Sequence, residues 1–267
     1  MNNAQPAWSG MVSVDDTALA VTDTGGAGQP VVYLNGSYAD QSHWRRVIAE
    51  LGGDFRHISY DERARGRSKR SADYTFEACM RDLDAVLEAR GVDRPILVGW
   101  SYGAMIAVHW ADRNPGRAQG VVSVDGAMPH DWLDDAAREQ IRKLFRRLSP
   151  LFPIARPLGL AARMSAAQHA EINIEINELM APALLEPLLD RLSEPVRYVL
   201  ASGGNLGAQE ELIEKIRTNL DGVFARNPNI QLSTTVASNH SKILRKDFRA
   251  VADAVREVAV SRDHADG

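Results

Sequence analysis

The chain has 267 residues and a mass of 29.3 kDa, with 45% hydrophobic and 25% charged residues, so it can bury a large core. A net charge of −4 and an isoelectric point near 6.0 argue against a broad nucleic-acid-binding face. The most basic run, at 61–70, also contains acids, and we interpret it as a solvated loop. The single cysteine, Cys79, excludes an intrachain disulfide and is expected to be buried. We expect no signal peptide, no membrane span and a cytoplasmic location.

Apolar runs typical of buried strands alternate with helical patterns. In chain order we predict a strand at 30–36, a helix at 42–52, a strand at 54–61, a helix at 75–92, a strand at 94–100, a helix at 102–115, a strand at 120–126, then a strand at 195–204, a helix at 209–220, a strand at 229–238 and a helix at 243–260. Such strands, rich in Val, Ile and Leu, are covered on both sides. The pattern therefore predicts an α/β fold with a mostly parallel sheet and helices on both faces.

The interval from 128 to 194 breaks this alternation. It holds helical patterns punctuated by prolines and no convincing strand. We therefore predict a core formed by 1–127 and 195–267, with 128–194 inserted as a helical cap over the site. The basic amphipathic stretch at 138–148 is expected to serve as a cap face rather than a membrane contact. An apolar face on such a cap would also allow a homodimer.

The segment GWSYG places a serine at an abrupt corner between a predicted strand and a predicted helix. Gly99 and Gly103 stand two residues from Ser101 on either side, where so tight a turn leaves no room for side chains. The corner lifts the serine hydroxyl clear of the backbone. The helix behind it directs N–H groups toward charge that develops there. This context indicates a nucleophilic serine rather than a plain turn.

Four segments together resemble the α/β-hydrolase family over nearly the full length of the chain. Besides GWSYG, YLNGSYADQSHW is similar to the family's segment after the third strand, with Asn35 where a histidine usually stands. YDERARGRS resembles the loop after the fourth strand, and ASNHSKILRKDF resembles the late histidine loop. The resemblance implies an eight-stranded, mostly parallel sheet whose first hairpin begins near residues 10–22. We expect no metal and no other cofactor.

The resemblance also implies the partners of Ser101. His240 follows the last predicted strand, where the family's catalytic base stands, and a serine hydroxyl needs an imidazole to take its proton. The family's usual acid follows the seventh strand, but ASGGNLG has no carboxylate there. Asp125, after the sixth strand, is the expected acid, as in a minority of the family that includes zearalenone lactonase, haloalkane dehalogenases and cofactor-free quinaldine dioxygenases. Glu210 and Glu211 are the alternatives.

An oxyanion hole needs two backbone N–H groups. One is expected from Tyr102, the residue after the nucleophile, and the resemblance implies that Ser37 supplies the other. A glycine at position 36 lets that loop turn its amide inward. Gly36, Trp100 and Trp132 are expected to contact the substrate because they neighbour the nucleophile, the oxyanion loop or the cap.

These residues predict a serine hydrolase that cleaves a small or medium apolar ester, lactone or related acyl compound. A second hypothesis keeps the fold and uses the His240–Asp125 pair as a base on the substrate, as in a cofactor-free oxygenase, a lyase or an isomerase. A third is a hydrolase-like receptor that binds a ligand without turnover. In each case the expected partner is a small molecule, and neither nucleic acid nor a membrane. Fold analogy does not supply the substrate.

Overall fold

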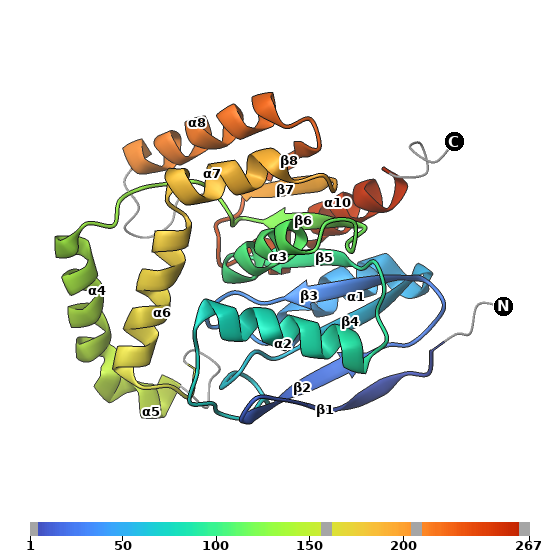
Figure 1. Ribbon diagram of the computed structural model, residues 1–267, viewed down its shortest axis with the longest axis horizontal. Coiled ribbons are helices and arrows are strands. Elements are labelled where there is room, and N and C mark those ends of the chain that lie inside the picture. Colours follow the sequence, from blue (N-terminus) through green and yellow to red (C-terminus); the bar gives the residue numbers. More distant parts are fainter. Residues whose placement is uncertain (1–4, 156–161, 204–209, 262–267) are drawn as a thin grey trace.

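The computed structural model describes residues 5–155, 162–203 and 210–261, and these contain one eight-stranded sheet with helices on both faces (Figure 1). The strands are β1 (Trp8–Val14), β2 (Thr17–Asp23), β3 (Gln29–Leu34), β4 (Phe55–Tyr60), β5 (Ile96–Trp100), β6 (Gly120–Val124), β7 (Val196–Ala201) and β8 (Ile230–Val236). Their order is β1-β2-β4-β3-β5-β6-β7-β8; β2 is antiparallel to both its neighbours, and all other pairs are parallel. The predicted α/β class, mostly parallel sheet and first hairpin are confirmed.

Side chains of the central strands alternate between two buried clusters, one on each face of the sheet. In β3, Val31 and Tyr33 join one cluster while Val32 and Leu34 join the other. The first cluster is completed by α1 (Arg45–Leu51) and α10 (Phe248–Val260), and the second by α2 (Phe76–Ala89), α3 (Tyr102–Arg113) and α8 (Glu210–Arg226). Because successive residues of a strand point to opposite faces, a strand covered on both sides must be apolar throughout, which explains the continuous runs.

The helix predicted at 243–260 is wrong as a single element. The chain forms α9 (Ile243–Lys246) and α10, and between them Asp247 has φ −115° and ψ 31°, outside the helical region. Aspartate is a poor residue inside a helix because its side chain competes for backbone N–H groups. The helix predicted at 209–220 extends instead to Arg226.

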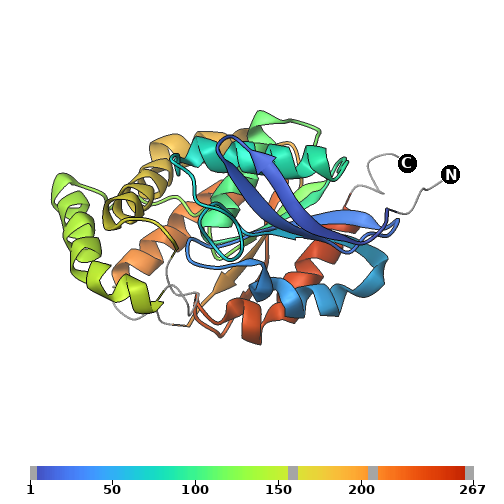
Figure 2. The same cartoon turned by 90° about the horizontal axis from the view of Figure 1, so that it is seen from below.

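Between β6 and β7 the described chain forms helices. They are α4 (Asp135–Leu148), the 3₁₀ turn η3 (Ser149–Leu151), α5 (Phe152–Ala155), α6 (Ala166–Leu179) and α7 (Pro182–Arg191). In both views α4, α5 and α6 stand beyond the carboxyl ends of the parallel strands (Figures 1 and 2), whereas α7 packs against α3 and α8. Within the described ranges, no helix has the length and apolar content that a bilayer crossing requires.

The interpretation of residues 61–70 as a solvated loop is wrong for most of its length. Five polar or charged side chains of this loop are buried: Asp61, Glu62, Arg63, Arg65 and Ser68. The Arg63 guanidinium pairs with the carboxylate of Asp82 on α2 at 2.5 and 2.8 Å, and neither side chain is exposed. Charges buried in this way require partners, so the loop is a packed part of the core edge.

Replacing Asp82 with alanine should lower the free energy of unfolding by about 3–5 kcal/mol, because it removes the buried carboxylate that pairs with the Arg63 guanidinium and leaves only the partly exposed Asp15 as a counterion. Urea denaturation followed by circular dichroism measures the loss. Arg81→Ala is the matched control: this neighbour makes ion pairs with Asp15 and Asp73 at the surface, and its loss should cost about 0–1 kcal/mol. Equal effects of the two substitutions would contradict this account.

Candidate active site

Ser101 occupies a strained corner between β5 and α3. Its φ is 55° and its ψ is −112°, a conformation that residues other than glycine rarely adopt. A Cβ atom at Gly103 would lie 2.1 Å from the carbonyl oxygen of Leu34 on β3, and one at Gly99 would lie 2.3 Å from the carbonyl oxygen of Gly103. Both glycines of the motif are therefore required by direct backbone contact, and the start of α3 can lie close against the sheet.

His240 and Asp125 meet across the ends of two strands that are far apart in the sequence. The His240 Nδ1 atom lies 2.7 Å from Asp125 Oδ2, and Asp125 Oδ1 accepts a hydrogen bond from the backbone N–H of Ala201 at 3.0 Å. The Asp125 side chain is 9% exposed and that of His240 is 31% exposed. A carboxylate can only accept, so the contact assigns the proton to Nδ1 and leaves Nε2 to accept another. Both Asp125 oxygens are thus held, which orients the imidazole.

One pocket of about 520 Å³ collects most of the predicted residues. Ser101 and His240 line it together with Gly36, Ser37 and Trp100. Its remaining lining comes from the oxyanion loop, the cap and the late histidine loop: Tyr38, Ala39, His43, Asn173 and Ser241. Ser101 and His240 therefore share one cavity. The amide of Tyr102 belongs to the first residue of α3, directly after Ser101.

One of the expectations from sequence falls elsewhere, and two concern side chains outside the described structure. Among described residues the pocket lining does not include Trp132, whose indole N–H donates to Asn177 on α6 at 3.0 Å. Helix α8 begins at Glu210, but the side chains of Glu210 and Glu211 lie outside the described part of the structure. Asp125 is therefore the described carboxylate that reaches His240.

Five residues of the pocket lining were not predicted from the sequence, and two of them contact each other. Asn173 on α6 donates through Nδ2 to the hydroxyl oxygen of Tyr38 at 3.0 Å, so the cap touches the oxyanion loop here. Tyr38 follows the predicted Ser37 directly and could have been included on that ground. No pattern in the sequence between β6 and β7 distinguishes Asn173 from the other polar residues of α6, since its hydrogen-bond partner, Tyr38, belongs to another segment.

A buried polar network holds the start of the oxyanion loop. Asn35 donates to Glu62 through its backbone N–H and through Nδ2, both at 2.8 Å. Asn35 Nδ2 also donates to the Tyr60 carbonyl, and its Oδ1 accepts from Trp44 Nε1 at 2.7 Å. Every polar atom of this amide is thereby used. Asn35, which stands where the family usually has a histidine, is thus a structural anchor for the loop.

Two charged side chains, Glu62 and Arg65, lie beside Asn35 and the loop that follows it. Burial raises the pKa of Glu62 to about 7, against a lowering influence from the nearby Arg65 cation and from the hydrogen bonds of Asn35. Arg65, itself buried, donates from Nε to the Ser37 carbonyl oxygen at 2.6 Å. The Asn35 N–H and the Ser37 carbonyl oxygen, in the residues before and after Gly36, are therefore held by side chains of the 61–70 loop, which the sequence had predicted to be solvent-exposed.

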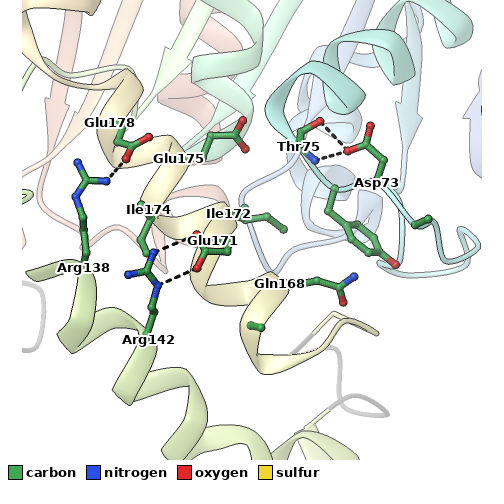
Figure 3. A pocket seen from close by; sticks show the side chains of 13 residues that line it. Asp73, Thr75, Arg138, Arg142, Gln168, Glu171, Ile172, Ile174, Glu175 and Glu178 are labelled. Carbon is green, nitrogen blue, oxygen red and sulfur yellow. Dashed lines mark hydrogen bonds and ion pairs between the residues drawn. The ribbon is translucent and has the colours of Figure 1, made fainter. Parts of the chain in front are cut away.

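A second cavity, of about 490 Å³, lies between the cap and the loop that leads into α2. Figure 3 shows Arg138 and Arg142 reaching from α4 to Glu178 and Glu171 on α6. The Arg142–Glu171 contact is 2.9 Å, and a third carboxylate, that of Glu175, accepts the first backbone N–H of α2 at 2.9 Å. Its charges are occupied by one another and its lining contains none of the predicted catalytic residues, so we assign no chemistry to it.

A metal site would need three or more closely placed His, Cys, Asp or Glu side chains, and none is found within the described ranges. The remaining histidines in these ranges have other surroundings. His109 on α3 packs edge-on against Phe76, and burial lowers its pKa to about 4. His57 on β4 lies 2.8 Å from the Tyr33 hydroxyl through Nδ1. Both are core histidines.

Comparison with known proteins gives a family and several relatives. Residues 29–185 match a family model described as alpha/beta hydrolase fold. A haloalkane dehalogenase from Mesorhizobium japonicum is 30% identical over 139 residues, 51% of this chain and 45% of that protein. A 2-succinyl-6-hydroxy-2,4-cyclohexadiene-1-carboxylate synthase from Serratia proteamaculans is 31% identical over 127 residues, 47% of this chain and 48% of that protein. These matches span about half the length of the curated relatives.

Solved structures extend the likeness over the whole chain. The enol-lactonase from Burkholderia xenovorans LB400 superposes with a TM-score of 0.69 at 19% identity, and the match covers 94% of this chain and 100% of that one. At so low an identity the superposition concerns the fold alone.

The titration of Glu62 should make stability depend on pH. Its pKa of about 7 in the folded state lies above the 4.5 of an ordinary glutamate, so the folded state holds the proton more tightly. The stability contributed by this group is present below pH 4.5 and is lost as the pH rises to about 7, a change on the order of 3 kcal/mol.

Thermal or urea unfolding at several pH values, compared between the wild type and Glu62→Gln, measures this contribution. The difference between the two proteins should vary across the pH 4.5–7 window and level off outside it. Glu88→Gln, at an exposed position on α2, should follow the wild-type profile. Parallel profiles for the wild type and Glu62→Gln would contradict the assignment.

Proposed function

This chain belongs to the α/β-hydrolase fold family, and we propose that it is a serine hydrolase acting on a small or medium ester, lactone or related acyl compound. The observation that carries the proposal is the 2.7 Å contact between His240 and Asp125, in a pocket that His240 shares with Ser101. An oriented imidazole beside a serine on a strained turn is the arrangement that acyl transfer requires. Cations beside this pocket narrow the class of substrate further.

In the proposed mechanism Ser101 Oγ attacks the substrate carbonyl carbon, and His240 Nε2 accepts the hydroxyl proton. Asp125 stabilises the imidazolium that forms. The backbone N–H groups of Tyr102 and Ser37 donate to the oxyanion of the tetrahedral intermediate. As this intermediate collapses, His240 passes its proton to the leaving group. Water, deprotonated by His240, then cleaves the acyl-enzyme and restores Ser101.

The presence of serine at the elbow favours acyl chemistry over dehalogenation, although several relatives carry the name haloalkane dehalogenase. If Ser101 Oγ displaced a halide from an alkyl carbon, the product would be an ether. An ether has no carbonyl carbon that water activated by His240 could attack, so the enzyme would stop after one turnover. An ester formed from an acyl substrate keeps such a carbon. The nucleophile therefore supports an acyl compound as the substrate.

Replacing Ser101 with alanine should abolish covalent labelling by a fluorophosphonate and lower kcat on an ester by about 10⁴-fold or more, since no acyl-enzyme can form. Intact mass spectrometry measures the adduct. Ser202→Ala, at an exposed serine outside the pocket lining, should label normally.

Other outcomes identify the rival functions. If Ser101→Ala converts a substrate at the wild-type rate, hydrolysis through Ser101 is wrong and the His240–Asp125 pair acts as a base on the substrate, as an oxygenase, lyase or isomerase would require. Tight ligand binding without any product would indicate a receptor.

Asp125→Asn should lower kcat/KM on an ester by about 10³–10⁴-fold, because the amide can donate to Nδ1 and stabilise the wrong tautomer of His240. Glu210→Gln and Glu211→Gln are the comparison variants, and their kcat/KM should stay close to the wild type. If one of these glutamate substitutions costs more than Asp125→Asn, the acid is misassigned.

A further inference from the structure

Another space, called the basic hollow below, adjoins the catalytic pocket near His240. It differs from the cavity between α4 and α6 described above. It has a volume of about 570 Å³ and shares His43, Trp100 and Ser241 with the catalytic pocket. The rest of its lining comes from the segment around η1 (Gln41–Trp44) and α1 and from the segment that follows His240: Ser42, Arg45, Arg46, Lys242, Leu244 and Arg245. Four of these six side chains are cations, and none of the described residues that line the hollow has a carboxylate.

The four cations lack counterions within the described ranges. Arg45, Arg46, Lys242 and Arg245 take part in none of the ion pairs found there. Arg45 Nε donates to the Ser42 carbonyl oxygen at 3.0 Å and Arg46 Nη1 to the Arg245 carbonyl oxygen at 2.9 Å, but neutral carbonyls do not cancel charge. His43 differs, because the Asp40 carboxylate lies 3.4 Å from its Nδ1 atom.

The arginines of another cavity in this molecule do have counterions. In the cavity between α4 and α6, Arg138 and Arg142 are both paired with glutamates. The whole chain has a net charge of −4, so an uncompensated cluster of positive charge runs against its composition. Two segments about two hundred residues apart bring their cations to one hollow, and the Arg46–Arg245 contact joins them. Like charges gathered in a concave space raise the local potential, which favours an anion there.

The position of the hollow fixes which part of a substrate can reach it. Ser241 and Lys242 directly follow His240 in the chain. The Trp100 ring lies between the two histidines, with its centroid 5.4 Å from that of His240 and 6.0 Å from that of His43. His240 must protonate the leaving group, so the leaving group departs on the side of the imidazole.

We infer that this basic hollow binds a phosphate or carboxylate carried on the leaving-group side of the substrate. The inference rests on the proposed acyl hydrolysis and narrows it: the substrate is an ester or thioester whose alcohol or thiol half is anionic. Arg245 and Lys242 are the side chains with no hydrogen-bond partner of their own in the described structure, and Arg45 has its Nη groups free for a bidentate contact.

Three esters with one acyl chain test this: phenyl butyrate, 4-carboxyphenyl butyrate and 4-phosphonooxyphenyl butyrate. The measured quantity is kcat/KM for each anionic ester divided by kcat/KM for the neutral ester, at low ionic strength. In the double variant Lys242→Met/Arg245→Gln this ratio should fall by about 10-fold or more from its wild-type value. Intrinsic differences in leaving-group reactivity cancel, because the same esters are compared in each protein. Comparison of the ratios for the carboxylate ester and the phosphate ester shows which of the two anions the hollow prefers.

Arg249→Gln is the matched control. It removes one positive charge at a nearby exposed position on α10 that does not line the hollow, and the ratio should stay at the wild-type value. An equal fall of the ratio in both variants would show a general effect of net charge. It would overturn the inference that this hollow binds the anion. An unchanged ratio in the double variant would overturn it directly.

Isothermal titration with inorganic pyrophosphate separates the two proposals, because it requires no turnover. Binding by the wild type that is lost in the double variant and kept in Arg249→Gln supports the hollow even if no ester is cleaved, in which case only the hydrolase proposal fails. If phenyl butyrate is hydrolysed but pyrophosphate does not bind and the anionic esters are not preferred, the hydrolase proposal stands. Only the inference that the hollow binds an anion is then overturned. Sedimentation with phosphatidylserine vesicles that depends on Lys242 and Arg245, with no binding of pyrophosphate, would reassign the surface to a membrane and overturn the inference.

Discussion

The close approach of two backbones beneath Ser101 governs the geometry of the rest of the site. At Gly103 the start of α3 lies so near the Leu34 carbonyl that a single methyl group would overlap it. This contact couples Ser101, directly after β5, to the end of β3, from which the loop with Gly36 and Ser37 departs. A looser packing would relax the strained backbone of Ser101 and move its amide and that of Tyr102 away from the loop. The serine and the groups that would stabilise an oxyanion are thus placed by one steric constraint.

Buried polar side chains extend this constraint outward. Glu62 accepts hydrogen bonds from the backbone N–H and Nδ2 of Asn35, and Arg65 donates to the Ser37 carbonyl oxygen. On the opposite side of Ser101, both oxygens of Asp125 are engaged, one by His240 and one by the backbone at the end of β7. Asp125 and His240 are therefore oriented before any substrate binds, which is how electrostatic stabilisation avoids a reorganisation cost.

Charge is distributed differently in the two hollows beside the cap and the histidine loop. Between α4 and α6 the arginines are neutralised by glutamates and bind the helices to one another. Beside His240 the cations of α1 and of the segment after β8 have no ion pair within the described ranges, in a hollow that shares three lining residues with the catalytic pocket. The first arrangement stabilises the packing of the two helices. The second leaves positive charge that an anionic group of a substrate can neutralise. The distinction depends on where the acids lie, since both regions contain several arginines.

The sequence by itself determined the α/β class, the strand-to-helix corner at Ser101 and the candidate partners His240 and Asp125. The class and the corner depend on local period and turn chemistry, which neighbouring residues carry, whereas the two partners follow from the resemblance to the α/β-hydrolase family. The tertiary structure alone decided that residues 61–70 are buried, that Asn35 anchors the oxyanion loop, that helix 243–260 breaks at Asp247, and that Arg46 and Arg245 share a hollow. Burial and charge compensation depend on partners distant in the chain, so no local pattern could predict them.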